Sequence, residues 1–145
     1  MDAGRGTSEE RGAVEGFKFG KREWIWNTFD AHRLLRFAGT EGASGAQRAL
    51  KHVLFRVYHG EGRNPGAHDV LLELAAEVGL PVERARHVLR SAAYAEEVRA
   101  AERFWQELGI HSVPAIVIDR KHLISGGQPS GVFEQALRRI DADRI

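Results

Sequence analysis

The sequence predicts an α/β fold that is mostly helical, in which a helical region is followed by a β-hairpin and a last helix. Between residues 27 and 108, apolar residues recur at the spacing of α-helices, and capping residues separate one helical stretch from the next. Residues 115–118 are instead a continuous apolar run, mainly β-branched, which is typical of a buried strand. A polar turn and a second short apolar stretch then follow, as in a hairpin.

The composition is that of one ordinary globular domain. The chain has 145 residues, of which 43% are hydrophobic and 28% are charged. Its 21 basic and 20 acidic residues leave a net charge of +1, so we expect neither nucleic acid nor a membrane as a partner. No apolar stretch approaches the roughly 20 residues of a membrane span, and the first residues show no signal-peptide pattern. A cytoplasmic location is the resulting prediction.

Three parts are expected along the chain: residues 1–15, 16–109 and 110–145. The first part is rich in Gly, Ser, Glu and Arg and predicts a disordered tail. Next, Phe and Trp residues at 17, 19, 24 and 26 alternate with polar neighbours, which predicts two short extended pieces that dock on the helices that follow.

The part at 16–109 is predicted to be a helical subdomain. Each helix begins near a capping residue or a proline, and several end at a glycine. The expected helices span residues 29–38, 44–60, 70–78, 82–90 and 94–108.

The part at 110–145 is predicted to be strand, strand and helix. Residues 115–118 and 122–125 form the hairpin around a polar turn at 119–121. Gly126 and Gly127 end the second strand, and a helix with an apolar stripe then runs from about Ser130 to Ile140.

Three stretches carry a family resemblance: residues 27–35 (NTFDAHRLL), 109–118 (GIHSVPAIVI) and 123–129 (LISGGQP). Together they resemble the DsbA-type thioredoxin-fold proteins, in particular the FrnE-like branch. The resemblance implies a thioredoxin fold with an inserted helical subdomain and an ancestry among thiol–disulfide oxidoreductases. Proteins of this family begin with a strand that leads into a Cys-x-x-Cys pair. This sequence contains no cysteine, and we expect it to be truncated, lacking the N-terminal βαβ half.

The resemblance also implies where a ligand would bind. Val113-Pro114 is expected to hold a cis peptide bond beside a groove in which a substrate chain pairs with exposed backbone. From the residues alone, Pro114 is simply a proline kept out of the strand interior. The resemblance places Asn27, His32 and Arg33 near the ligand-facing side, whereas the residue pattern alone makes Asn27 a helix cap and the other two helix-surface groups.

No catalytic residue, metal site or cofactor is predicted in this chain. None of the seven histidines stands at the spacing of a His-Glu-x-x-His or similar ligand pair. No serine has a histidine and an aspartate in a recognisable triad pattern. The absence of cysteine removes the thiolate ligands and the disulfides as well.

Two classes of function therefore remain, and whether the chain is an enzyme stays open. In the first, it is a protein of the DsbA and FrnE-like oxidoreductase family without redox activity of its own, or a remnant of a glutathione-using isomerase of the same fold. In the second, it is a non-catalytic binding module or a complementing subunit, with a peptide or small molecule in the groove at Val113-Pro114.

The strand at 115–118 also predicts association. It is apolar on both faces, and the sequence offers no confident neighbour for one of its edges. Apolar surface left in water forfeits about 25 cal/mol per Å². A complementing chain, a second copy or a truncated reading frame would each account for this edge, and we expect a twofold homodimer. The alternative is that residues 17–26 fold back and cover the region within one chain.

Overall fold

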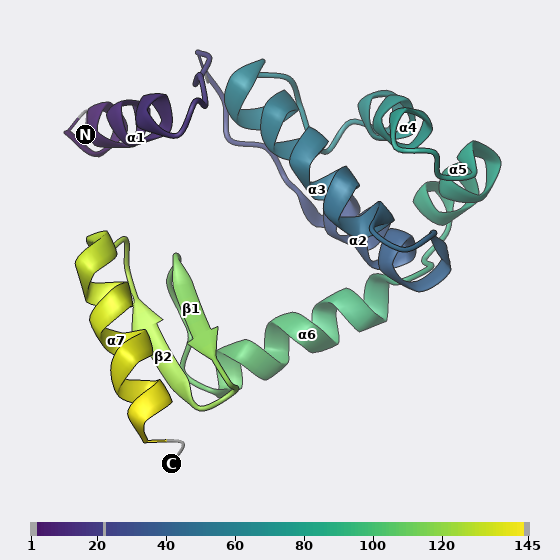
Figure 1. Cartoon of the computed structure of the whole chain (residues 1–145). Coiled ribbons are helices and arrows are strands. Elements are labelled where there is room, and N and C mark those ends of the chain that lie inside the picture. Colours follow the sequence, from purple (N-terminus) through teal and green to yellow (C-terminus); the bar gives the residue numbers. More distant parts are fainter. Residues whose placement is uncertain (1–2, 22, 144–145) are drawn as a thin grey trace. The chain divides into compact units, whose positions relative to one another are not determined.

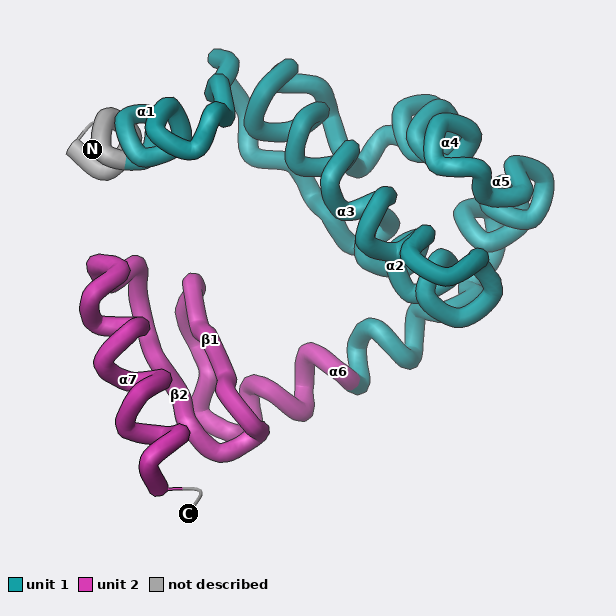
Figure 2. The backbone as a smooth tube through the Cα atoms, viewed as in Figure 1, with its two compact units in different colours: residues 1–100 teal, residues 101–145 magenta. Residues whose placement is uncertain are grey.

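The computed structural model describes residues 3–21 and 23–143, and it is mostly helical, as predicted (Figure 1). The chain divides into two compact units, residues 1–100 and 101–145 (Figure 2). In chain order, the elements are α1 (Ala3–Val14), α2 (Phe29–Glu41), α3 (Ala46–Phe55), the π-helical turn η1 (Arg56–Gly60), α4 (His68–Glu77), α5 (Val82–Arg90), α6 (Ala95–Glu107), β1 (Ala115–Ile118), β2 (His122–Ser125) and α7 (Ser130–Ala142).

The boundary between the units lies inside α6, whereas the sequence predicts it between residues 109 and 110. The reason is that α6 is one continuous helix whose two ends have different surroundings. Val98, near its start, is buried, whereas residues 101–109 are all exposed. Helical periodicity shows where a helix runs, but it does not show where its packing changes.

The core of the first unit is formed by the apolar faces of α2, α3, α4 and α5. Helix α2 packs against both α3 and α5, and α4 packs against α3 and α5. Each fully buried side chain of this kind contributes about 1.5–3 kcal/mol through removal of apolar surface from water. The largest fully buried side chains are Phe37, Leu34, Leu50, Leu71, Leu74, Val57 and Val88.

The five helices predicted for this region are present, with two differences. Helix α2 continues past Gly39 to Glu41. A Cβ at Gly39 would lie 2.7 Å from the amide nitrogen at the end of the flexible Gln47 side chain, which would have to shift. The helix expected at 44–60 is α-helical only to Phe55 and ends in η1, a π-helical turn that periodicity does not reveal.

The disordered tail expected at residues 1–15 is wrong for the described residues, because α1 occupies most of that segment. Gly16 ends the helix in the left-handed region, at φ +76°. The N–H of Phe17 donates to the carbonyl of Gly12 at 2.7 Å, and the ring of Phe19 packs close to Gly12. Phe17 and Phe19 lie beyond the helix in the sequence. The few apolar residues of the helix itself therefore do not predict these contacts.

The described residues 17–21 and 23–27 dock on the helical unit, as predicted, but as irregular chain and not as strands. The N–H of Gly20 donates to the carbonyl of His59 in η1 at 2.8 Å. A Cβ at Gly20 would lie 1.9 Å from the carbonyl oxygen of Gly60, so only glycine allows this approach. Aromatic contacts support the same docking, between Phe19 and His59 and between Trp26 and Tyr58.

The second unit contains β1 and β2, which form an antiparallel two-stranded sheet, followed by α7. Ala115 pairs with Ser125 and Ile118 with His122, so the predicted hairpin is confirmed with its turn at 119–121. Asp119 and Arg120 both have positive φ, at +54° and +56°. The described part of the chain contains no helix long and apolar enough to cross a membrane.

Candidate functional site

The bond between Val113 and Pro114 is cis, as the family resemblance implies. It lies directly before β1, and the carbonyl of Pro114 accepts a hydrogen bond from the N–H of Gly126 at 2.8 Å. This hydrogen bond joins Pro114, just before β1, to Gly126, just after β2. The side chain of Val113 is 90% exposed, so it is available to a ligand, while the groove expected beside it stays a prediction.

Asn27 lies just before Thr28, the N-cap residue of α2. Its Oδ1 accepts a hydrogen bond from the N–H of Phe29 at 2.8 Å, which satisfies one of the helix's unpaired N-terminal donors. His32 is in the first turns of α2 with an exposed side chain. The sequence predicts a cap at Asn27 or Thr28, and the structure places the N-cap at Thr28 with Asn27 bonded to the first turn from the preceding position. A ligand-binding role for Asn27 or His32 stays a prediction.

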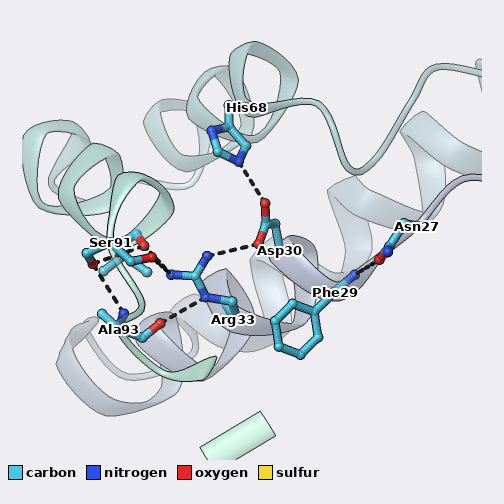
Figure 3. A network of polar contacts seen from close by, with 8 residues as sticks. Asn27, Phe29, Asp30, Arg33, His68, Ser91 and Ala93 are labelled. Atoms are coloured by element: carbon cyan, nitrogen blue, oxygen red, sulfur yellow. Dashed lines mark hydrogen bonds and ion pairs between the residues drawn. The ribbon is translucent and has the colours of Figure 1, made fainter. Parts of the chain in front are cut away.

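Arg33 is buried, with 4% of its surface exposed, which neither expectation for it anticipates. Its guanidinium group donates to the backbone carbonyls of Val88, Ser91 and Ala93 and pairs with Asp30 at 2.9 Å (Figure 3). Val88 and its neighbours lie at the end of α5, where helix carbonyls lack partners within the helix. Arg33 therefore fastens α2 to the end of α5 and to the loop that follows.

Asp30 joins this arginine to a second helix. One of its oxygens accepts from Arg33, and the other lies 2.7 Å from Nε2 of His68, the first residue of α4 (Figure 3). Partial burial acts to raise the pKa of Asp30, but the hydrogen bonds from His68 and Arg33 outweigh it and lower that pKa. The carboxylate thus stays charged between two donors and connects α2 with α4.

The sequence singles out Arg33 but misses its partners Asp30 and Ser91, and it misses His68, which contacts Asp30. Asp30 could have been found, because it precedes Arg33 by three residues and such pairs lie on one helix face. His68 and Ser91 are distant in sequence, so only the packing of α4 and α5 on α2 reveals them. The network thus brings together groups that support the fold, and it offers a ligand only the exposed parts of Asp30 and His68.

These polar groups do not form a metal centre. Among the residues that the structure describes, no three His, Asp or Glu side chains are grouped so as to hold a metal ion. The other candidate site is at Val113-Pro114, where Val113 is exposed next to a cis bond.

Comparison with known proteins places this arrangement in a family. A family model described as a DsbA-like thioredoxin domain matches residues 13–138. A solved structure of a probable DsbA oxidoreductase from Streptomyces coelicolor is 38% identical to the chain, with a TM-score of 0.88, and the match covers 99% of this chain and 62% of that one. The chain therefore spans under two thirds of that protein's length.

A second solved structure, of a 2-hydroxychromene-2-carboxylate isomerase, is 18% identical with a TM-score of 0.79. The match covers 99% of this chain and 70% of the isomerase chain. At that identity the likeness concerns the fold alone. No curated protein matches the sequence.

Proposed function

The chain belongs to the DsbA-like thioredoxin domain family, and we propose that it binds extended polypeptide at Val113-Pro114 without itself exchanging disulfides. One observation carries the proposal: a cysteine-free chain of this family presents an exposed Val113 on a cis bond at the entry to β1. Binding a polypeptide and exchanging its disulfides are separate steps that use different groups. This chain contains groups for the binding step only.

Thiol–disulfide exchange needs a thiolate that attacks a disulfide sulfur and forms a mixed disulfide. The 145 residues contain no cysteine, and their single methionine has a thioether that cannot do this. Exchange in the presence of this chain thus requires a cysteine from outside these residues. A chain that complements it could supply that cysteine.

Polypeptide binding requires backbone groups and an apolar side chain that are open to a partner. An extended chain can add to an exposed strand edge through main-chain hydrogen bonds, with side-chain contacts giving preference. Val113 is 90% exposed and is separated from the strand β1 only by Pro114. Covering it would remove apolar surface from water, so we expect unfolded polypeptides with apolar residues to be the ligand class.

The proposal also covers the branch of the family and the cellular location. The stretches at 27–35, 109–118 and 123–129 support membership of the FrnE-like branch, for which we expect a cytoplasmic location. The glutathione-using isomerase alternative has only a likeness of fold in its support. Saturable binding of glutathione by the purified chain, measured by calorimetry, would favour that alternative over polypeptide binding.

The exchange part of the proposal is tested with reduction of insulin by a dithiol. The purified chain should leave the rate at that of buffer, while a thiol-free unfolded polypeptide should still bind it. Turnover above the buffer rate in metal-free protein would refute the absence of exchange.

A further inference from the structure

Tyr94 lies in the connection between α5 and α6 and has an unusual backbone conformation. Its φ is +61°, in the left-handed region that a residue with a bulky side chain rarely adopts. A residue in such a conformation persists only where the surrounding structure fixes it, and residues of this kind are concentrated at sites that bind or switch. The contacts of Tyr94 therefore decide whether this connection keeps its shape.

The side chain of Tyr94 contacts two other helices of the first unit. Its ring packs against Phe37, a fully buried residue of α2, with the ring centroids 6.4 Å apart. Its hydroxyl donates a hydrogen bond to Oε1 of Glu41, the last residue of α2. Arg84 of α5 donates to both oxygens of the same carboxylate, each at 2.9 Å, in the bidentate arrangement that is the stronger kind of ion pair. Glu41 thus accepts from α5 and from the connection after it.

Both groups of this hydrogen bond keep the protonation state that it needs. The hydrogen bonds from Arg84 and Tyr94 lower the pKa of Glu41 to about 2, because they favour the charged carboxylate. The bond to Glu41 in turn raises the pKa of Tyr94 above its usual value. The carboxylate therefore stays charged and the phenol stays neutral throughout the neutral pH range.

Tyr94 directly precedes α6 and contacts the helix's first turn. Its carbonyl accepts a hydrogen bond from the N–H of Val98 at 3.2 Å, and the side chain of Val98 is buried. One residue further, the guanidinium of Arg99 lies over the ring of Phe29 at 4.9 Å. Tyr94 contacts the second half of α2, whereas Arg99 contacts its first residue. The first turns of α6 therefore lie along α2 and run in the opposite direction.

We propose that the hydroxyl of Tyr94 locks the first turns of α6, residues 95–100, onto α2, and that these turns open as a local unit when the hydroxyl is removed. Helix α6 has one buried residue, whereas α2 has five, and segments with few buried contacts open at a lower free-energy cost than the core. The residues before Tyr94 are held separately, since Arg33 donates to the carbonyls of Ser91 and Ala93 (Figure 3). The lock lies within the first unit and does not rest on polypeptide binding at Val113.

Amide hydrogen exchange of the full-length chain tests the lock, because it reports local opening residue by residue. Tyr94→Phe keeps the ring against Phe37 and removes only the hydroxyl. We expect the amides of Val98 and Arg99 to exchange at least about fivefold faster in this variant, while the amide of Leu71 in α4 keeps its rate. Tyr58→Phe, at the other of the two tyrosines, is the matched control and should leave the α6 amides unchanged.

Glu41→Leu removes the acceptor instead of the donor and should speed exchange at Val98 to the same degree. Adding Tyr94→Phe to it should cause no further increase, since both substitutions remove the same hydrogen bond. Unchanged exchange at Val98 in Tyr94→Phe, equal acceleration in every helix, or additive effects of the two substitutions would each overturn the proposal. If circular dichroism shows that Tyr94→Phe does not fold, exchange in Glu41→Leu decides: acceleration confined to α6 supports the lock, and none refutes it.

Discussion

Arg33 donates hydrogen bonds to three backbone carbonyls at and after the end of α5 and pairs with Asp30. Arg33→Met keeps much of the side-chain volume but removes the donor to the carbonyls of Ser91 and Ala93, while the carbonyl of Val88 keeps the hydrogen bond from the Ser91 hydroxyl. Each buried polar group without a partner costs about 1–3 kcal/mol, so we expect a loss of about 3–5 kcal/mol in the free energy of unfolding. Urea unfolding followed by circular dichroism measures it.

Arg36→Met is the matched control for this substitution. Arg36 lies on the exposed side of the same helix, where a substitution changes stability by at most about 0.5 kcal/mol. Equal losses for the two variants would mean that the buried bonds of Arg33 do not support the fold.

Asp30 gives the helical unit a dependence on pH. Its pKa is lower in the folded chain than its usual value, so its carboxylate stabilises the fold above about pH 4. That stability is lost as the pH falls through the lower folded pKa. We expect the difference in unfolding free energy between wild type and Asp30→Asn to be full near pH 6 and to shrink below about pH 4. Urea unfolding across this range measures the difference, and one that does not change with pH would contradict the account.

His68→Gln tests one of the two donors to Asp30. Because Arg33 still pairs with the carboxylate in this variant, the pH-dependent difference should become smaller without disappearing. If the pH-dependent difference disappeared completely in this variant, His68 alone would account for it.

At the scale of elements, the segment around Gly20 docks on η1 through a close backbone contact. Gly20→Ala would place a Cβ 1.9 Å from the carbonyl oxygen of Gly60 and so force the two segments apart. We expect a loss of about 1–3 kcal/mol, as for other overpacked sites, seen as a lower thermal midpoint. Gly131→Ala, where a Cβ meets nothing within 4 Å, should be neutral or stabilising. If Gly20→Ala were as stable as Gly131→Ala, the described docking would be wrong.

The turn between β1 and β2 holds two non-glycine residues at positive φ. Such a conformation costs a residue with a Cβ roughly 1–2 kcal/mol, and hairpin turns of this kind favour glycine at the second position. Arg120→Gly should therefore stabilise the hairpin by about 0.5–1 kcal/mol, measured as slower hydrogen exchange of the β1 and β2 amides. Lys121→Gly, at a position without positive φ, should have the opposite effect, and faster exchange in Arg120→Gly would contradict the argument.

The elements with strong local patterns are the ones that the sequence predicts well. The helices α2 to α6 and the hairpin have clear periodicity, caps or β-branched runs, and the structure confirms them. Helix α1 has few apolar residues, and its end is held by Phe17 and Phe19 from outside the helix. The π-helical turn continues a helical pattern, so its changed hydrogen bonding leaves no trace in the spacing.

Some features of the candidate site can likewise be predicted from local patterns, and others cannot. Val113-Pro114 could be singled out because a Val-Pro before an apolar run is a local signal, and its cis bond is confirmed. The burial of Arg33 could not, since it follows from α5 ending beside α2 in the folded unit. The partners His68 and Ser91 come from elements 38 and 58 residues away.

At the scale of the whole molecule, the two units differ in how far their side chains are buried. The first has a core of fully buried side chains and a buried arginine whose hydrogen bonds are made within the unit. The second has no buried residue among those described and an uncharged strand edge. The family resemblance predicted from three stretches is confirmed at the level of the DsbA-like thioredoxin domain. The binding that we propose for the chain uses Val113, an exposed residue of this second unit.

The measurement that tests this central claim most directly is the binding of a labelled, alkylated and therefore thiol-free unfolded polypeptide, followed by fluorescence anisotropy. We predict saturable binding by the wild-type chain, at least tenfold weaker binding by Val113→Asp, a loss of about 1.4 kcal/mol, and unchanged binding by Val132→Asp, a substitution at another exposed valine of the second unit. No saturable binding by the wild type, or equal weakening by the two variants, would contradict the claim that this chain binds polypeptide at Val113-Pro114.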